Sequence, residues 1–388
     1  MKNCFIIAEY NPLHNGHIRQ IEYVKNKIRP DNIIVIMSGN FTQRGEVAIL
    51  DKFSRARHAV LSGVDAVIEL PTVFATQSAE IFAGGAIKLI SSFAGEKVLC
   101  FGAECGDKGE IFKVASSMLD ESEEFKSLLK EELKKGVSLL KARELALLKT
   151  ANINAEVLSK PNNVLGVEYV KAILKNGYDI EVEVLKRDGD YNDDKLGSSN
   201  PSALAIRTAV SNGKGKTLSS FVPPCVLNDL PSTLPSLDKE IFYSVLSSQK
   251  SELKEVPDCI EGLENRILTT TKESVSLEEL LSKIKTKRYT TARLRRILLS
   301  SLLKIDKTLV RSALKNKLYL KVLAINGNKA ELLPALSKSE YPLLTRKSDL
   351  AKLGKTAYST FEKDTFACNV YSIAIGEKLN EHNMIIVK

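Results

Sequence analysis

The sequence predicts an α/β protein with a doubly wound, Rossmann-like parallel sheet, followed by a mainly helical C-terminal region. Short, continuous apolar runs recur through the first hundred residues, and segments with helical spacing separate them. Such runs are typical of strands buried on both faces, and strand–helix alternation indicates a parallel sheet with right-handed crossovers. Prolines at 223, 224, 231 and 235 then mark the change to the helical region.

The expected strands of the N-terminal sheet are short apolar runs bounded by turn residues. They cover Cys4–Ala8, Ile33–Met37, Ala66–Ile68 with Leu70, and Val98–Phe101, which Gly102 closes. A fifth strand is expected where Ile180, Val182 and Val184 alternate with acidic residues, so that one face is polar. Leu318–Ile325 and Met384–Val387 are strand-like segments near the C-terminus.

Helices are expected between these runs, where apolar residues recur at helical spacing. One helix contains Ile18, Ile21, Val24 and Ile28, and Asp51 is expected to cap the next. Further helices are expected over Ala79–Leu89, within residues 109–150, after Pro161 and from Ser202. Residues 238–315 are predicted to form a series of short helices.

Length and composition limit the class of protein. At roughly 150 residues per domain, 388 residues suggest two or three domains. We divide the chain into residues 1–215, expected to bind a nucleotide, and residues 216–388, a mainly helical unit expected to bind RNA. A hydrophobic fraction of 44% excludes wholesale disorder. The formal charge of +9 favours a polyanionic partner, and nucleic acid is the first candidate.

The sequence also predicts a cytoplasmic protein without a membrane segment. No apolar run reaches the roughly 18–20 residues that a spanning helix needs. The six cysteines form no Cys-x-x-Cys pair, so neither a zinc motif nor a redox motif is indicated.

The segment expected to carry chemistry is Glu9–His17, which follows the first strand and opens the first helix. Two of the four histidines of the chain, His14 and His17, lie here three residues apart and flank Gly16. A helix N-terminus at the carboxyl end of a parallel strand attracts phosphate, and glycine lets it approach the backbone. Imidazole N–H groups would stabilise charge on an attacked phosphate. The alternative is a capping loop whose histidines only satisfy hydrogen bonds.

A second candidate element, Ser198–Arg207, lies late in the same unit. The first element resembles the signature of the nucleotidyltransferase superfamily, in which a late segment with Ser/Thr and a basic residue at a helix start grips the departing phosphates. The resemblance implies this role for Ser198–Arg207, where Arg207 would hold phosphate with its guanidinium fork. The alternative is an ordinary Pro/Ser helix start with a solvated arginine.

Together these elements resemble the nucleotidyltransferase superfamily, and a longer series of motifs resembles the tRNA(Met) cytidine acetate ligase family. The motifs, in order, are Ala8–His17, Met37–Glu46, Glu69–Pro71, Phe101–Glu104, and Lys160–Asn163 with Gly166, Glu168 and Tyr169. They cover about residues 1–210. The resemblance implies a nucleotidyltransferase-type fold.

The resemblance implies an ATP-dependent acetate ligase that forms acetyl-adenylate. It then transfers the acetyl group to N4 of the wobble cytidine of elongator tRNA(Met), giving N4-acetylcytidine. His14, His17 and Arg207 are then the catalytic residues, and Mg²⁺ is expected to travel on the triphosphate. By position, the ATP-binding residues are Ile7, Ala8, Glu9, Tyr10, Asn11, Pro12, Leu13, His14, Asn15, Gly16, His17, Ile18, Arg19, Gln20, Gly102, Asn163 and Arg187. The chain departs from the family pattern at Leu204, where a Thr is expected, and at Asp188, where a small residue is expected.

Two neighbouring segments receive different interpretations. The loop Ser38–Gly45 follows the second strand and is expected to handle acetate or RNA at the same edge of the sheet; the alternative is a polar connection between strand and helix. Arg55, Arg57 and His58 lie on the next helix, where we expect a solvated face.

RNA is expected to bind a basic segment of the C-terminal region. Its seven basic residues are Lys283, Lys285, Lys287, Arg288, Arg293, Arg295 and Arg296. No acidic residue interrupts them, and Tyr289 is placed to stack on a base. The alternative is a surface helix whose charges serve solubility.

Other functions remain open from the residues alone. A small-molecule adenylyl- or cytidylyltransferase of the same superfamily would release a nucleotidylated metabolite. A non-catalytic RNA-binding protein on a relic nucleotide fold would not need the two histidines. A class I aminoacyl-tRNA synthetase is less favoured, because no Lys-Met-Ser-Lys-Ser-like string occurs.

Overall fold

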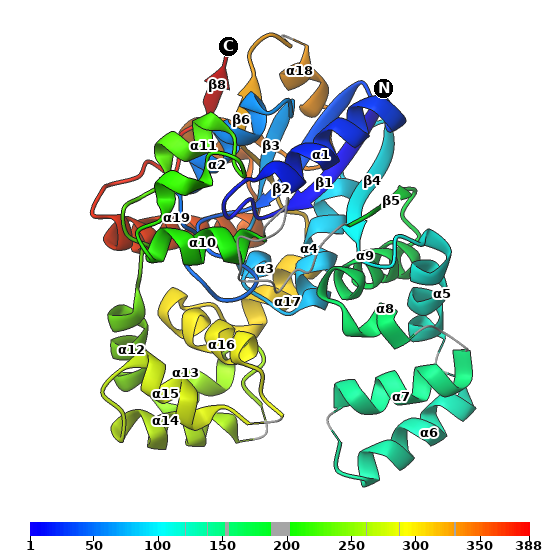
Figure 1. Ribbon diagram of the computed structural model, residues 1–388, viewed down its shortest axis with the longest axis vertical. Helices are drawn as coiled ribbons and strands as arrows, with labels where there is room; N and C mark the ends of the chain where they lie inside the picture. The colour runs from blue at the N-terminus through cyan, green and yellow to red at the C-terminus, as the bar shows by residue number, and fades with distance from the viewer. Residues whose placement is uncertain are drawn as a thin grey trace.

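The structure is a computed structural model that describes residues 1–120, 122–137, 139–151, 155–187, 202–260, 262–286, 288–329 and 331–388. A central sheet lies above two groups of helices in Figure 1. The predicted residues 188–201, with Asp188 and Ser198–Pro201, and the predicted Lys287 lie outside the described residues.

The central sheet confirms the predicted α/β class. Its order is β5-β4-β1-β2-β3-β6-β7, and the first five strands are parallel. Their bounds are β1 Lys2–Ala8, β2 Asn32–Ser38, β3 Ala66–Leu70, β4 Glu96–Ala103 and β5 Glu181–Lys186. Gly102 does not close β4 as predicted. It pairs with Leu185 of β5, so the strand runs on to Ala103.

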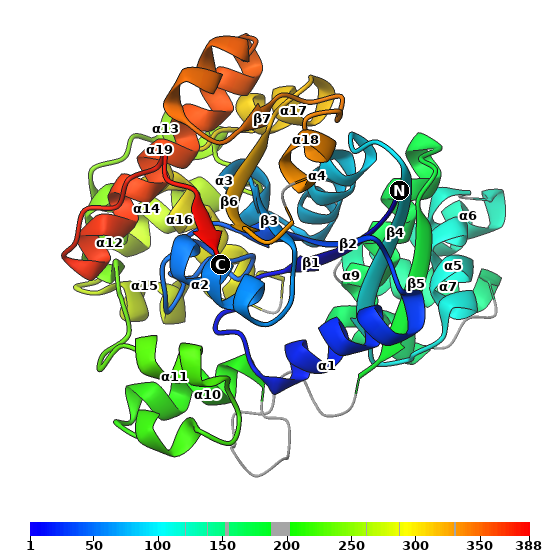
Figure 2. The same cartoon turned by 90° about the horizontal axis from the view of Figure 1, so that it is seen from above.

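Helices cover both faces of the sheet, because successive strand side chains point to opposite faces. Cys4 and Ile6 pack with α1 (Asn15–Tyr23) and its π-helical continuation (Val24–Ile28), α2 (Lys52–Leu61), α10 (Ala203–Ser211) and α11 (Pro224–Asp229). Phe5 packs on the other face with α3 (Thr72–Ala75), α4 (Ala79–Ser91), α5 (Lys108–Leu119) and α9 (Pro161–Asn176). Figure 2 shows α1 and α2 on one side of β1 and β2, and α3 and α4 on the other. Asp51 caps α2 as predicted.

Two groups of short helices extend from the sheet (Figure 1). The first consists of α6 (Glu123–Lys134), α7 (Leu139–Ala151) and α8 (Ala155–Ser159). The second consists of α12 (Asp238–Leu246), α13 (Lys250–Glu255), α14 (Leu263–Lys272), α15 (Leu277–Ile284) and α16 (Thr291–Leu303). The second group confirms the predicted series of short helices, and α17 (Lys307–Lys315) follows it beneath α3 and α4.

The end of the chain returns to the sheet. β6 (Leu320–Asn326) pairs antiparallel with β3, and both β7 (Leu343–Leu344) and β8 (Ile385–Val387) pair with β6. The intervening helices are α18 (Leu332–Leu336) and α19 (Lys355–Ile375). The division at residue 215 stays a prediction, and residues from both sides of it build one sheet.

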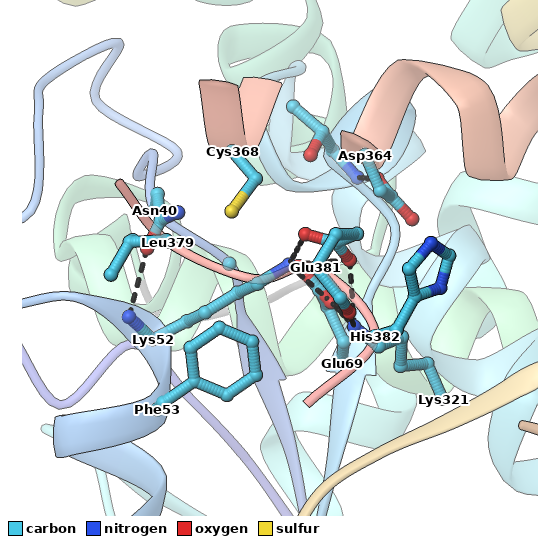
Figure 3. A network of polar contacts seen from close by, with 12 residues as sticks. Asn40, Lys52, Phe53, Glu69, Lys321, Asp364, Cys368, Leu379, Glu381 and His382 are labelled. Carbon is cyan, nitrogen blue, oxygen red and sulfur yellow. Dashed lines mark hydrogen bonds and ion pairs between the residues drawn. The ribbon is translucent and has the colours of Figure 1, made fainter. Parts of the chain in front are cut away.

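A buried cluster of charges joins the returning segment to β3 and α2 (Figure 3). The Nζ atom of Lys52 lies 2.7 Å from a carboxylate oxygen of Glu69 and 2.7 Å from one of Glu381. Lys321 of β6 lies 2.7 Å from Glu381 and 3.8 Å from Glu69. Burial alone would lower the pKa of Lys52, but the carboxylates of Glu381 and Glu69 raise it above its usual value. Two cations therefore face two anions in the interior.

This cluster also fixes the loop that follows β2. The backbone N–H of Lys52 donates to Oδ1 of Asn40 over 2.8 Å. Gly39 lies so close to Glu69 that an added Cβ would be 2.4 Å from its Oε1 atom. The predicted active-site loop therefore rests on the charged cluster. Among the described residues, no helix is both long and apolar enough to cross a bilayer.

Candidate active site

A cavity of about 140 Å³ opens at the carboxyl edge of the sheet, beyond β1 and β4. Open α/β sheets bind ligands at this edge. Three segments meet there: the β1–α1 loop, the loop after β2, and the start of α10. The lining residues are Ile7, Ala8, Glu9, Tyr10, Asn11, His14, His17, Gln20, Thr42, Gln43, Arg44, Glu46, Phe82, Phe101, Gly102, Asn162, Leu165, Tyr169, Arg187, Ser202, Ala203, Leu204 and Arg207.

The two predicted histidines cap α1 with one ring nitrogen each. Nδ1 of His14 accepts from the N–H of Gly16 over 3.1 Å, and Nδ1 of His17 accepts from the N–H of His14 over 3.2 Å. The rings lie against each other, with centroids 3.8 Å apart. Because each Nδ1 is an acceptor, the proton of each neutral ring is on Nε2. Within the described residues neither Nε2 has a partner, so both remain donors for a ligand.

Both imidazoles are neutral at physiological pH. Removal from water, followed by the nearby charge of Arg187, lowers the pKa of His14 to about 3. Desolvation, followed by His14 and Arg187, places the pKa of His17 well below its usual value. The capping interpretation and the phosphate interpretation are thus compatible, because Nδ1 serves the helix while Nε2–H stays available in rings that line the cavity.

Acidification should destabilise the protein through His14. Its pKa is about 3 in the folded chain and near 6.5 in an ordinary environment, so the unfolded chain binds the proton first. This contribution is complete above pH 6.5 and is lost as the pH falls towards 3, by up to ~1.4 kcal/mol per pH unit. Urea unfolding at about pH 7 and about pH 5 measures the loss. His14→Asn, which does not titrate, should show a smaller difference; an equal difference would contradict the assignment.

Two glycines make room for charged and aromatic side chains at the site. A Cβ on Gly16 would lie 2.9 Å from Cε1 of His14, so any larger residue would displace the ring. A Cβ on Gly102 would lie 2.9 Å from Cγ of Arg187, whose stem crosses the end of β4 there. Gly16 therefore positions the imidazole, in addition to its predicted role of admitting phosphate.

The predicted phosphate-binding arginine faces the cavity. Nη1 of Arg207 donates to the carbonyl of Asn11 over 2.8 Å, and its Nη2 lies 3.2 Å from Glu46. Ser202 caps α10 by accepting from the N–H of Ala205, which fixes the helix start. Arg207 therefore already joins the β1–α1 loop to the loop after β2.

The other predicted ATP-binding residues divide into two groups. Ile7, Ala8, Glu9, Tyr10, Asn11, Gln20, Gly102 and Arg187 line the cavity with the histidines, whereas Pro12, Leu13, Asn15, Gly16, Ile18 and Arg19 do not. Asn163 is buried, and its Oδ1 accepts from the N–H of Cys105 over 3.0 Å. Its neighbour Asn162 lines the cavity instead, and Leu204, at the position of the expected Thr, is also part of the wall. Which of them touch ATP stays a prediction.

The sequence pattern did not predict the environment of some residues at the site. We expected Arg55 on a solvated face, but it is fully buried, and its guanidinium donates to the carbonyls of Glu9, Ser38 and Gly39. It therefore ties the end of β1 to the end of β2. His58 is also buried rather than solvated, and it contacts Asp229 over 2.7 Å.

Arg57 is partly exposed and pairs with Asp229 at 2.6 Å. The apolar wall of the cavity, formed by Phe82, Phe101, Leu165 and Tyr169, was also missed as part of the site. Phe82 and Leu165 carry only an ordinary core signal in the sequence, whereas Phe101 and Tyr169 lie in the motifs that carry the family resemblance.

The loop Ser38–Gly45 contributes Thr42, Gln43 and Arg44 to the cavity. Its backbone is held on one side by Glu9, whose Oε1 accepts from the N–H of Gln43 over 2.7 Å. Desolvation raises the pKa of this carboxyl group above its usual value. The geometry thus brings the loop to the predicted edge of the sheet.

The basic segment is only partly exposed. Lys283, Lys285 and Arg288 are exposed, whereas Arg293 donates to the carbonyl of Asp258, and Arg296 lies 3.8 Å from the carboxylate of Asp258. The expected stacking of a base on Tyr289 is wrong for this conformation. The tyrosine ring is buried, and the guanidinium of Arg293 lies 5.0 Å from its centroid. Arg295 lines a second cavity.

A parallel α/β sheet with paired imidazoles at the first strand–helix junction defines a nucleotidyltransferase. Residues 1–384 match the family model described as HIGH Nucleotidyl Transferase. The chain is 38% identical over 381 residues to the tRNA(Met) cytidine acetate ligase of Thermoanaerobacter sp. (strain X514). The alignment covers 95% of this chain and 94% of that protein. This chain belongs to the tRNA(Met) cytidine acetate ligase family.

Solved structures agree with this assignment. The fold matches the crystal structure of Thermotoga maritima TmcAL in its apo form with a TM-score of 0.92 and 30% identity, over 100% of both chains. The same protein bound with alpha-thio ATP matches with a TM-score of 0.89, 30% identity and the same coverage.

Proposed function

We propose that this protein activates acetate with ATP as acetyl-adenylate and transfers the acetyl group to N4 of the wobble cytidine of elongator tRNA(Met). The observation that carries the proposal is the pair of neutral imidazoles beyond the carboxyl end of β1, each with its Nε2–H available to donate to a ligand. Relatives at about the same length carry the corresponding name, and one structural relative is bound with alpha-thio ATP.

In the first step an acetate oxygen attacks the α-phosphorus of ATP in line. The bond from that phosphorus to the bridging oxygen breaks, and pyrophosphate leaves. His14 and His17 donate to the oxygens on which charge develops, an electrostatic stabilisation that needs no covalent intermediate. Arg207 would exchange its contact with Glu46 for the departing phosphates, since its planar fork matches phosphate oxygens.

In the second step the exocyclic amine of cytidine attacks the carbonyl carbon of acetyl-adenylate. The bond from that carbon to the phosphate oxygen breaks, AMP leaves, and the amine loses one proton. The adenylate must be kept from water during this exchange, and the cavity supports this because its walls are formed by packed loops.

The cavity of about 140 Å³ is smaller than the ~300 Å³ common for ligand sites, so side chains at its mouth must move when a nucleotide binds. We propose that Mg²⁺ accompanies ATP and supplies charge neutralisation on the triphosphate. The described residues contain no group of three metal-binding side chains, which fits an ion held by phosphate and water.

We propose that tRNA is held partly by exposed basic residues before α16. Lys285→Glu with Arg288→Glu should weaken tRNA binding and reduce its log–log salt dependence by about 1–2, because roughly two phosphate contacts are lost. The matched control is Lys130→Glu, which reverses the charge of an exposed lysine on α6, in the other group of helices. Binding measured between low and moderate salt checks this. An unchanged salt slope would exclude these residues from the tRNA surface.

The test of the proposed function is incubation with ATP, labelled acetate and total tRNA, followed by nucleoside analysis. Labelled N4-acetylcytidine with stoichiometric AMP is expected. A nucleotidylated metabolite, formed without tRNA, would favour a small-molecule nucleotidyltransferase instead.

A further inference from the structure

A second cavity, of about 340 Å³, lies beside the first and is outside the predicted ATP site. Its walls come from the loop after β2, from α10, from the proline-rich segment before α12, and from α15 and α16. The volume lies within the ~300–1,000 Å³ of typical small-molecule sites. It is therefore large enough for a single nucleobase.

The two cavities share a wall. Glu46, Leu204 and Arg207 line both of them. The ion pair between Arg207 and Glu46, with atoms 3.2 Å apart, stands between the two spaces. If Arg207 leaves Glu46 for phosphate, as proposed above, the ion pair that separates the two spaces is broken. A group in the second cavity would then face the reactive end of a nucleotide in the first.

The residues that line the second cavity suit a nucleobase, which is a flat ring with polar groups at its edge. Apolar side chains of Ile241, Leu277 and Leu298 provide surfaces against which a base can pack. Thr208 and Asp238 provide hydroxyl and carboxylate oxygens, which accept from an exocyclic amine. Sequence-specific RNA recognition uses this combination of packing and edge contacts on a splayed-out base.

The charge at the cavity points to RNA as the source of that base. Arg295 lies on the wall and, within the described part of the chain, has no ion pair or hydrogen bond. It belongs to the basic segment, and the exposed Lys285 and Arg288 precede it. Arg296, its neighbour, donates to the carbonyl of Gln43 in the active-site loop over 3.4 Å. The basic segment and the first cavity are thus physically joined at this place.

We propose that the second cavity receives the acceptor cytosine of the RNA, turned out of its strand, and that Arg295 contacts the adjoining phosphate. An unpaired anticodon base is inexpensive to turn out, because little stacking is lost. This inference rests on the proposed function, since it supplies the subsite in which the amine awaits the acyl group.

The experiment fills the cavity from two walls with Ser236→Phe and, separately, Thr208→Phe. Ser232→Phe, in the same exposed segment as Ser236 but outside the cavity lining, is the matched control. Two reactions are measured: acetate-dependent ATP–pyrophosphate exchange without RNA, and acetyl transfer to tRNA. We expect transfer to fall by roughly 100-fold in both filled variants, the size of effect that misplacing a reacting group produces. Exchange should stay within about twofold of wild type, and the control should keep both reactions.

Retention of transfer in both filled variants would overturn the inference. Equal loss of exchange and transfer would also overturn it, since the cavity would then serve ATP. Absence of any transfer by the wild-type protein would instead refute the proposed function, so the two failures are distinguishable. As a second measurement, Arg295→Ala should weaken tRNA binding while leaving exchange unchanged, and an unaltered affinity would remove the phosphate contact from the inference.

Discussion

Replacing His14 with asparagine should lower acetate-dependent ATP–pyrophosphate exchange by about 10²–10³-fold, the usual cost of one charge-stabilising donor. Asparagine is a favoured N-cap, and its Oδ1 can accept from the N–H of Gly16 as Nδ1 does now. It is too short to replace the Nε2–H donor. The variant therefore separates the capping role of the imidazole from its role toward phosphate.

The control for this prediction is His14→Gln, whose longer amide can place an N–H near the position of Nε2. We expect it to recover part of the exchange rate lost in His14→Asn. Thermal unfolding of both variants verifies that α1 is intact. If His14→Asn folds normally and keeps wild-type exchange, the imidazole is only a cap and the proposed chemistry is wrong.

Replacing Lys52 with methionine should destabilise the fold by about 3–5 kcal/mol, because the carboxylates of Glu69 and Glu381 would lose a shared, buried cation. The charged cluster of Figure 3 would then hold two anions against Lys321 alone. Denaturant unfolding measures the loss. Because Gly39 of the active-site loop packs closely against the Glu69 carboxylate, a shift of the unpaired Glu69 should also lower the exchange rate.

Lys2→Met is the matched control for the charged cluster. Its ion pair with Glu96 has a comparable distance of 3.1 Å but lies at the surface, where solvent screens it, so we expect no measurable change. Adding Glu381→Gln to Lys52→Met should restore part of the lost stability by removing one unpaired anion. A loss of stability no larger for Lys52→Met than for Lys2→Met would contradict a structural role for the cluster.

The strands were predictable because their signal is local. Ile33–Met37 is a continuous apolar run, and Ala66–Ile68 with Leu70 is interrupted only by Glu69; short runs of this kind are typical of strands buried on both faces. The histidine pair was predictable for the same reason, since residues three apart at a helix start share one face. In these segments, the neighbouring residues in the sequence determine whether a side chain is buried and which face it shares.

The remaining features depend on partners distant in the chain. Arg55 has the sequence pattern of an exposed helix residue, and its burial follows from carbonyls at the ends of two strands. Nothing near Asn163 reveals that its side chain turns to Cys105 while Asn162 faces the cavity. The pairing of β6 with β3 likewise joins segments about 250 residues apart, which a local pattern does not encode.

The most direct test of the site is a crystal structure of this protein with a non-hydrolysable ATP analogue. The account predicts an α-phosphate oxygen within about 3 Å of Nε2 of His14 or His17, with Arg207 turned from Glu46 to the outer phosphates. A triphosphate bound in another part of the molecule, with both imidazoles still packed against protein, would contradict it.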